Sequence, residues 1–335
     1  MIRLPIVLLA AFVVSGCAVS KVDPSQFSPV DIDSVENLPS KELLQGRKAR
    51  AVVFRTDEKS SLSKTMSLGD ATTGSIEAQL SATTEIIDRS LASKLKGEIQ
   101  LGELSGATSN GPSLADFAVL SEISAAKWNK RYAVASSYTD DEGKVHRTPA
   151  KCHYDAEVQG NVKVYSLPSM SLINTISVGA KSRSSEDARH RHCNTSKAQQ
   201  AGLLNAAATK AIKKQKHQLK NIFAPTGYIL GRRVNEEGSI FRVSLGAKRG
   251  IQAGSTVSIT RSVLSHSQLG GDLNEVLRLG TAKVVSPVEE NYAWLYVKDE
   301  VLANKIKLGD TIKINYKKSL LSSLTENIPY ADLVP

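Results

Sequence analysis

The first sixteen residues constrain the folded protein most, because they carry the features of an export signal. Arg3 precedes an apolar run over residues 4–14, and two small residues follow at positions 15 and 16. A positive start, a short apolar core and small residues at the end are typical of a secretory signal peptide, whereas a membrane-spanning helix needs about 20 apolar residues. We therefore expect residues 1–16 to be removed as a signal peptide and the remaining chain to fold outside the cytoplasm.

The signal ends on a cysteine. The stretch Val14-Ser15-Gly16-Cys17 resembles the lipobox of bacterial lipoproteins, in which the signal is cut before the cysteine and the cysteine is lipidated. This resemblance implies acyl chains on Cys17; an ordinary signal peptide with an incidental cysteine is the alternative. In that family an aspartate after the cysteine commonly signals inner-membrane retention. Ala18 stands there, which implies the periplasmic face of the outer membrane in a Gram-negative cell.

Composition bounds the size of the protein and the kind of partner. The 335 residues allow two domains of ordinary size, and the 41% hydrophobic content is enough for a packed core. No segment after the signal is long and apolar enough to span a bilayer as a helix. The net charge of +10 falls to +9 when Arg3 leaves with the signal. A basic excess favours lipid headgroups or acidic polymers, although it also suits a plain solvated surface; nucleic acid fits the charge but not the export signal.

Two cysteines remain after lipidation, Cys152 and Cys193. In an oxidising compartment a lone pair usually forms a disulfide, and a turn at Pro168-Ser169 brings residue 152 opposite residues near 185. The neighbouring histidines, in Cys152-His153 and in the run 190–193, suggest zinc as an alternative. Adjacent residues on a strand point to opposite faces, so this spacing is poor for a metal site. We expect the disulfide, no metal and no cofactor.

The chain divides into five stretches. Residues 1–16 are the lipoprotein signal peptide, and residues 17–46, with three prolines and no persistent period, read as a flexible tether. Residues 47–224 mix strand and helix patterns, Pro225 closes that domain, and residues 226–317 change to short strands separated by glycine turns. Residues 318–335 form a tail. The fold class is therefore α+β: a mixed sheet packed with helices, followed by a small all-β barrel.

Periodicity places the elements within these domains. In the first domain we expect strands at 49–54, 84–88, 115–123, 153–167 and 171–180, and helices from 73, at 90–104 and at 196–223. Residues 128–150 are polar with a hairpin tip at 140–143, Gly160 indicates a bulge, and 182–194 is a charged loop. In the second domain we expect strands at 228–233, 240–245, 256–260, 279–285, 293–297 and 311–316.

The order of these patterns resembles the CsgG-like family over residues 48–223. The matching segments are the strand 51–54, the strand-to-helix turn 84–91 with 94–98, the Ala-Asp strand 115–120, the strands 160–165 and 171–173, and an alanine-rich closing helix. Related folds occur in the amino-terminal domain of TolB and in LpoB. The resemblance implies a CsgG-like domain. Pore-forming members carry membrane-crossing hairpins, but residues 56–69 and 128–150 lack a roughly ten-residue alternating apolar strand, so we do not expect a channel.

The second domain resembles the barrel that ends the flagellar protein FlgT. Residues 245–257 match a turn with the pattern G-x-x-x-G-(I/V)-x-x-G-(D/S)-x-V, and residues 308–312 hold a shorter G-D-x-(I/V) form. The resemblance implies an SH3-like barrel whose glycines permit positive φ between strands. Any small β-barrel uses such turns, and that is the alternative interpretation.

No familiar catalytic motif is present, so we expect a protein that is not an enzyme. Asp116 and Glu122 lie an even interval apart on one expected strand and form a candidate carboxylate pair, with a plain charged strand face as the alternative. A mixed aromatic and cationic group offers a polysaccharide surface, with an ordinary exposed hairpin as the alternative: Trp128, Tyr132, Tyr138, Lys127, Lys130 and Arg131. The closing helix offers a partner-binding face of lysines: Lys210, Lys213, Lys214, Lys216 and Lys220.

Two functions follow from the resemblances. The first is a structural or assembly lipoprotein of a cell-envelope machine, such as a flagellar basal-body ring, a pilus or a secretion complex. The second is an outer-membrane activator of a peptidoglycan synthase, similar to LpoB. The expected partners are the membrane itself, copies of this chain or other envelope proteins, and peptidoglycan. A long disordered tether favours the second function; the extra barrel and the short tether favour the first.

Overall fold

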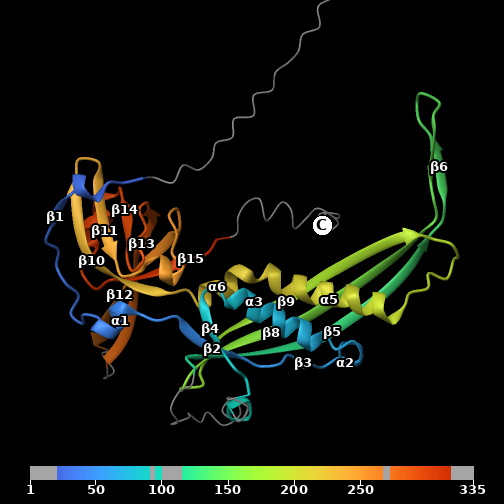
Figure 1. Ribbon diagram of the computed structural model, residues 1–335, viewed down its shortest axis with the longest axis horizontal. Coiled ribbons are helices and arrows are strands. Elements are labelled where there is room, and N and C mark those ends of the chain that lie inside the picture. Colours follow the sequence, from blue (N-terminus) through green and yellow to red (C-terminus); the bar gives the residue numbers. More distant parts are fainter. Residues whose placement is uncertain (1–20, 91–94, 100–114, 267–271, 318–335) are drawn as a thin grey trace, which may run out of the picture. The chain divides into compact units, whose positions relative to one another are not determined.

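The computed structural model describes residues 21–90, 95–99, 115–266 and 272–317 (Figure 1). The expected signal peptide, Cys17 and the expected tail lie outside them. The fold is mixed α+β and mostly sheet, in agreement with the expected class. The chain forms two compact units: unit 1 comprises Met1–Leu38 and Tyr228–Asp310, and unit 2 comprises Pro39–Gly227 and Thr311–Pro335.

Unit 2 is built on a mixed six-stranded sheet. The main strands are β2 (Ala49–Val53), β4 (Thr84–Ile87), β5 (Phe117–Ala133), β8 (Lys151–Ser166) and β9 (Leu172–Asp187), in the order β4-β2-β5-β8-β9. β2 runs parallel to β4 and β5, while β5, β8 and β9 are antiparallel, and the short β3 (Asp57–Glu58) also pairs with β5. A separate hairpin of β6 (Ser136–Thr139) and β7 (Val145–Thr148) extends away from this sheet (Figure 1).

Helices cover part of this sheet. They are α2 (Ser61–Thr65), α3 (Leu68–Leu80), α5 (Lys197–Lys214) and α6 (Lys216–Ile222), with a further helical stretch over residues 95–99, whereas the short α1 (Lys41–Gln45) precedes β2 in the chain. α5 begins at a capping box, in which Ser196 and Gln199 satisfy each other's backbone N–H groups. The expected single helix over residues 196–223 is broken at Gln215, which ends α5 and precedes α6.

The core of unit 2 lies on both faces of the sheet. On one face α3, α5 and α6 bury Val53, Ile76, Val162, Ile212 and their neighbours. On the other face Val52, Phe54, Ala118 and Tyr165 pack around Ile99. The expected alternation along β8 is confirmed, because Tyr154, Ala156, Val158, Val162 and Val164 are all buried.

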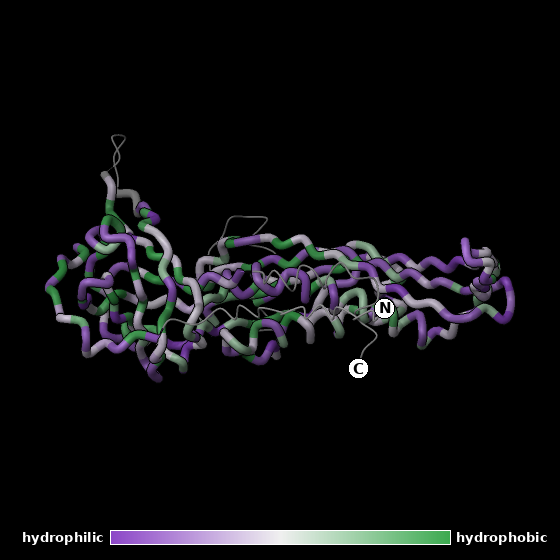
Figure 2. Tube along the Cα trace, turned by 90° about the horizontal axis from the view of Figure 1, so that it is seen from above, coloured by the Kyte–Doolittle hydropathy of each residue, from purple (hydrophilic) through white to green (hydrophobic). Residues whose placement is uncertain are grey.

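β5 and β9 are longer than expected. β5 runs to Ala133, into the polar stretch expected to hold a hairpin tip, and β9 runs to Asp187 through much of the expected charged loop. Past Ile123 in β5 and past Ala180 in β9 the side chains are exposed or half-buried, so their sequence has no apolar period to mark them as strands. Figure 2 shows mostly purple and white at the end of unit 2 that carries β6 and β7.

The expected bulge lies opposite Gly160 rather than at it. The register between β5 and β8 shifts between Ile123 and Ala125, so Ser124 is the extra residue. At Gly160 a Cβ atom would lie 2.1 Å from the carbonyl oxygen of Glu122. The close approach of the bulged strand therefore requires glycine at this position.

Unit 1 is built on antiparallel strands that bury a narrow core. They are β10 (Thr226–Asn235), β11 (Gly238–Val243), β12 (Thr256–His266), β13 (Asp272–Val285) and β14 (Ala293–Val297), with helix α7 (Glu300–Lys305). The seven-stranded sheet has the order β1-β10-β11-β14-β13-β12-β15, with β1 (Ser28–Val30) at one edge and, at the other, β15 (Thr311–Asn315), which begins at the first residue past the boundary of unit 1. β10 also pairs with β15, so the sheet closes.

The turns of this sheet use glycine as the sequence predicts. Gly250, Gly254 and Gly309 all have φ between 80° and 85°, in the left-handed region that favours glycine. β14 is found at the predicted residues, and β12 and β13 extend beyond the predicted ones. The finer SH3-like and CsgG-like assignments stay predictions.

The described part of the expected tether is folded. Residues 24–26 form the short helix η1 (Pro24–Gln26), β1 pairs with β10, and Phe27 is buried. Residues 41–45, also expected to be part of the tether, form α1. One buried phenylalanine and backbone pairing hold residues 24–30, and neither leaves a sequence period.

No helix in the described ranges is both long and apolar enough to cross a membrane.

Candidate binding site

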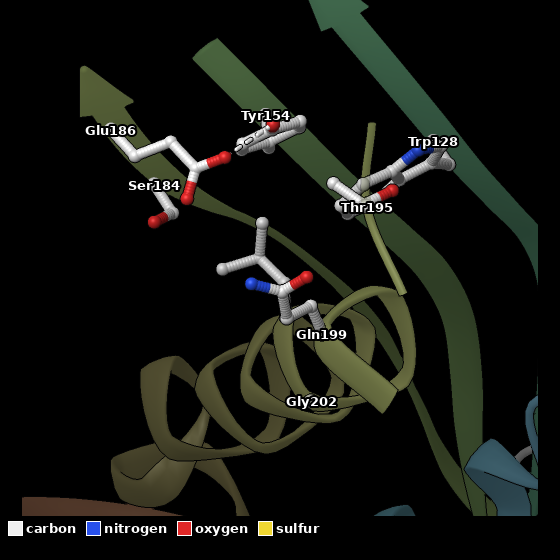
Figure 3. Close-up of a pocket in the computed structure, with 8 residues that line it drawn as sticks. Trp128, Tyr154, Ser184, Glu186, Thr195, Gln199 and Gly202 are labelled. Carbon is white, nitrogen blue, oxygen red and sulfur yellow. Dashed lines mark hydrogen bonds between the residues drawn. The ribbon is translucent and has the colours of Figure 1, made fainter. Parts of the chain in front are cut away.

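A small cleft of about 210 Å³ opens in unit 2 where the start of α5 faces β8 and β9 (Figure 3). The cleft is lined by both apolar and polar residues: Trp128, Tyr154, Ser184, Glu186, Thr195, Gln199, Gly202 and Leu203. The strands supply Trp128, Tyr154, Ser184 and Glu186, and α5 with the residues before it supplies the rest. Gly202 leaves the helix side open, because a Cβ atom there would have no neighbour within 4 Å.

The phenol of Tyr154 is the most perturbed group of the cleft. Its hydroxyl donates to Oε1 of Glu186 at 2.8 Å and lies 3.3 Å from the carbonyl oxygen of Asn194. Burial, together with the hydrogen bond to the Glu186 carboxylate and its charge, raises the pKa of Tyr154 to about 12. The phenol is therefore a proton-bearing donor at any physiological pH, with Glu186 as its acceptor.

The expected disulfide lies directly beside the cleft. Cys152 on β8 is bonded to Cys193, with Cα atoms 5.4 Å apart. Trp128 stacks on Tyr154 at a centroid distance of 5.9 Å, and both rings pack against the bridge. The disulfide thus fixes the stretch before α5, which includes Thr195, against the sheet. Because the two sulfurs are bonded to each other, they are not available as zinc ligands in this state, and no metal-binding group occurs among the described residues.

The arrangement suits binding rather than proton transfer at neutral pH. The tyrosine holds its proton to about pH 12, and the carboxylate that faces it is already engaged as an acceptor. An aromatic wall, a carboxylate and the Gln199 amide can hold a small polar group.

The candidate carboxylate pair is not a pair. Both oxygens of Asp116 accept hydrogen bonds from Arg47 at 2.6 Å, and one also accepts from the backbone N–H of Arg50. Partial burial acts to raise the pKa of Asp116, but these bonds outweigh it and hold that pKa below its ordinary value. Glu122 is instead 3.5 Å from the Asn161 amide. Asp116 therefore ties the chain before β2 to the start of β5.

The expected aromatic and cationic surface is divided. Trp128 and Tyr132 pack toward the disulfide, whereas Tyr138 lies on the β6–β7 hairpin and stacks on His146 at 4.8 Å. Lys127, Lys130 and Arg131 are exposed on β5. These residues do not form one stacking platform for a polysaccharide.

The lysines of the closing helix do not share one exposed face, because the helix breaks at Gln215. Lys213 and Lys216 are exposed, and Lys210 and Lys214 are half-buried. The ammonium of Lys220 lies over the ring of Tyr316 at 5.6 Å, and burial followed by the charge of Lys216 lowers the pKa of Lys220. A partner-binding role for the lysines stays a prediction.

Sequence reasoning found the cysteines but not the cleft. The alternation along β8 predicts that Tyr154 is buried. The pattern does not predict the hydrogen bond that its hydroxyl makes. Glu186 fell in the expected charged loop, where nothing marked it as a strand residue facing α5. The capping residue Gln199 could have been found from the Ser-x-x-Gln spacing at the helix start.

Comparisons with known proteins add little. No protein family and no curated protein matches the sequence. Solved structures that match part of the chain include hypothetical protein CT253 from Chlamydia trachomatis, with 14% identity over 53% of this chain and 98% of that one at a TM-score of 0.27. A minor lipoprotein from Acinetobacter baumannii matches with 7% identity over 56% and 98% at 0.27. A PelC dodecamer from Paraburkholderia phytofirmans matches with 9% identity over 50% and 87% at 0.24. At TM-scores this low we draw neither fold nor function from them.

Proposed function

We propose that this chain is an outer-membrane lipoprotein, anchored through Cys17 on the periplasmic face, that serves as a non-enzymatic assembly component of a cell-envelope machine. The observation that carries the proposal is the lipobox followed at once by folded protein. Only three residues separate Cys17 from Lys21, where the described chain begins to pair with unit 1. Acyl chains on Cys17 would hold the folded domain that follows at the membrane surface.

The disulfide supports the exported location. A bridge between Cys152 and Cys193 forms and persists in the periplasm but not in the reducing cytoplasm. The bridge lies at the end of the sheet from which the β6–β7 hairpin extends. In an oxidising compartment it therefore stabilises this end of unit 2.

The hairpin supports a partner-binding role. Tyr138 and Val145 are more than half exposed on its two opposite faces, and Val134 is more than half exposed just before it. An isolated two-stranded hairpin is only marginally stable in water, and exposed apolar side chains on one are typical of a surface that a partner covers. The partners we propose are other copies of this chain or other envelope proteins.

Activation of a peptidoglycan synthase is the alternative function, and it needs reach from the membrane. The packed residues 21–30 shorten that reach, because a folded segment spans far less than the roughly 3.3 Å per residue of an extended one. The structure therefore favours the assembly role over the alternative.

The anchor is tested by fractionation of cells that produce Cys17→Ser, with Ser20→Ala as the matched control. We expect the control to sediment with outer membranes, and the Ser variant to be released or left unprocessed. A Ser variant that is processed and still sediments as before contradicts the lipid anchor.

The assembly role is tested by crosslinking in intact envelopes. The double variant Tyr138→Ala/Val145→Ala should lose the crosslinked species that the unchanged protein forms, while Lys144→Ala at the hairpin tip keeps them. Unchanged crosslinks in the double variant contradict the hairpin as the contact. Turnover of peptidoglycan or peptide by the purified protein contradicts the non-enzymatic role.

A further inference from the structure

The short connection to the lipid places unit 1 close to the membrane. Four residue steps join Cys17 to Lys21, and an extended chain covers at most about 14 Å over that length. Lys21 forms an isolated parallel β-bridge with Ser286, and the backbone N–H of Val22 donates to the carbonyl oxygen of Ser286 at 2.9 Å. The chain that leads from the lipidated cysteine therefore joins unit 1 beside the end of β13.

The outer face of the sheet at that point is aromatic. β14 alternates, so Ala293, Leu295 and Val297 point into the core of unit 1, while Tyr292, Trp294 and Tyr296 share the outer face. Val22 and Phe27 pack over Ile240, Val285 and Trp294 on this face. The N-terminal segment, residues 21–30, thus covers the apolar centre and leaves a rim.

The rim carries cations. Directly opposite residues of antiparallel strands share a face, and Arg242 is opposite Trp294 while Lys283 is opposite Tyr296. The guanidinium of Arg242 lies 4.1 Å from the ring centre of Tyr292, and that of Arg233 lies 5.4 Å from the ring centre of Trp294.

Two of these cations, together with Lys21 of the N-terminal segment, are available to a partner. Arg242, Lys283 and Lys21 are exposed, whereas Arg233 also donates to the carbonyl oxygen of Pro24 at 2.8 Å. The acid within the N-terminal segment is Asp23, and its carboxylate is engaged by the backbone N–H and hydroxyl of Ser25.

We propose that this rim, made of Lys21, Arg242, Lys283, Tyr292 and Tyr296, lies on the anionic headgroups of the membrane that holds the lipid of Cys17. Tyrosine and tryptophan side chains favour the boundary between headgroups and water, and arginine and lysine bind lipid phosphates. The lipid brings the rim to the surface, and the rim fixes which side of unit 1 faces it. The inference rests on the proposed lipidation for its geometry but not for its chemistry.

The chemistry is tested without the lipid. The mature chain with Cys17→Ser is sedimented with vesicles of neutral phosphatidylcholine alone or with added phosphatidylglycerol. We expect binding to the anionic vesicles only, weakening as salt rises, and about a fivefold loss for each cation removed in Arg242→Gln/Lys283→Gln. Lys213→Gln/Lys216→Gln on unit 2 removes the same charge and should bind as before. Equal losses in both double variants, or a loss in the unit 2 variant alone, overturn the proposal.

The orientation is tested in the lipidated protein. The chain has two tryptophans, so Trp128→Phe leaves Trp294 as the sole donor for energy transfer to dansyl headgroups. We expect strong transfer from Trp294, reduced in Arg242→Gln/Lys283→Gln although that variant still sediments with the vesicles. Transfer unchanged by the double substitution overturns the rim as the contact. Loss of sedimentation for the unchanged protein would instead contradict the anchor, which separates the two failures.

Discussion

The two units bury the apolar side chains of their sheets in different ways. Unit 1 closes its sheet, so strand residues such as Phe241 and Leu295 face a common interior and are fully buried. Unit 2 keeps an open sheet, and β9 is exposed over most of its length. Closure supplies a core from every strand, whereas an open sheet has a core only where something covers it.

The difference shows where each unit needs additional support. In unit 1 the apolar residues left over are on the outside, around Trp294, and the N-terminal segment covers them. In unit 2 the sheet end beside the start of α5 has few apolar residues, and the Cys152–Cys193 bridge with the rings of Trp128 and Tyr154 holds it together. Each support should therefore matter to its own unit.

Loss of the disulfide should have the largest effect and should be confined to unit 2. The bridge joins residues 41 apart, and in the chain-entropy treatment a loop of that length stabilises by about 4 kcal/mol. We expect Cys152→Ala/Cys193→Ala to lower the free energy of unfolding of unit 2 by that order. Hydrogen exchange should speed up in β8 and β9 and stay unchanged in β11 and β14. Equal acceleration in both units would break the comparison.

Truncation of Phe27 is the corresponding test in unit 1. A buried phenylalanine replaced by alanine costs about 3 kcal/mol, and here the loss uncovers Trp294 and Val285. We expect Phe27→Ala to release the N-terminal segment and to increase exchange in β1 and at the outer edge of β10. Ser28→Ala, an exposed neighbour, is the control. If Phe27→Ala leaves exchange in β1 unchanged, the segment is not held as described.

The bulge in β5 gives a test within the covered part of unit 2. A methyl group at Gly160 would collide with backbone at 2.1 Å, whereas at Gly179 on β9 its nearest neighbour would be 3.6 Å away. We expect Gly160→Ala to destabilise unit 2 by about 2 kcal/mol, because backbone must shift, and Gly179→Ala to change stability little. Urea denaturation of the two variants measures this. A similar cost at both positions contradicts the assigned register.

The smallest effect concerns pH at the cleft. Because the pKa of Tyr154 is raised to about 12 in the folded protein, its contribution to stability is complete below pH 10 and is lost as pH rises through 12. Glu186→Gln removes the charge and should lower the pKa of Tyr154 while leaving it above 10, since burial is the larger cause. Absorbance at alkaline pH, with Tyr154→Phe as the blank, reports this titration. An unchanged midpoint in Glu186→Gln would show that the carboxylate does not act on the phenol.

Elements that leave a repeating pattern in the sequence were predicted, whereas single contacts between distant parts of the chain were not. The period along β8, the run 293–297 and the turn glycines such as Gly250 each leave a pattern, and each is found. The disulfide followed from the compartment and from having only two candidates. The packed N-terminal segment depends on Phe27 and on an outer sheet face whose parts, Ile240 and Trp294, are far apart in the chain. No local pattern records such a contact.

The break at Gln215 and the extent of β9 were missed for related reasons. No proline or glycine marks the break, and nothing in the neighbouring sequence explains it. β9 past Ala180 is exposed, so its strand structure comes from pairing with β8 rather than from its own residues. Glu186 could therefore not be assigned to the cleft from the sequence.

The mass of the N-terminal peptide tests most directly whether the mature chain begins at a lipidated Cys17, a few residues before the folded part of unit 1. Protein is taken from membranes, digested without reduction and analysed by mass spectrometry. We predict a peptide that begins at Cys17, carries acyl groups and continues into Lys21. A mature chain that begins at any other residue, or an unmodified Cys17 in membrane-bound protein, would contradict it.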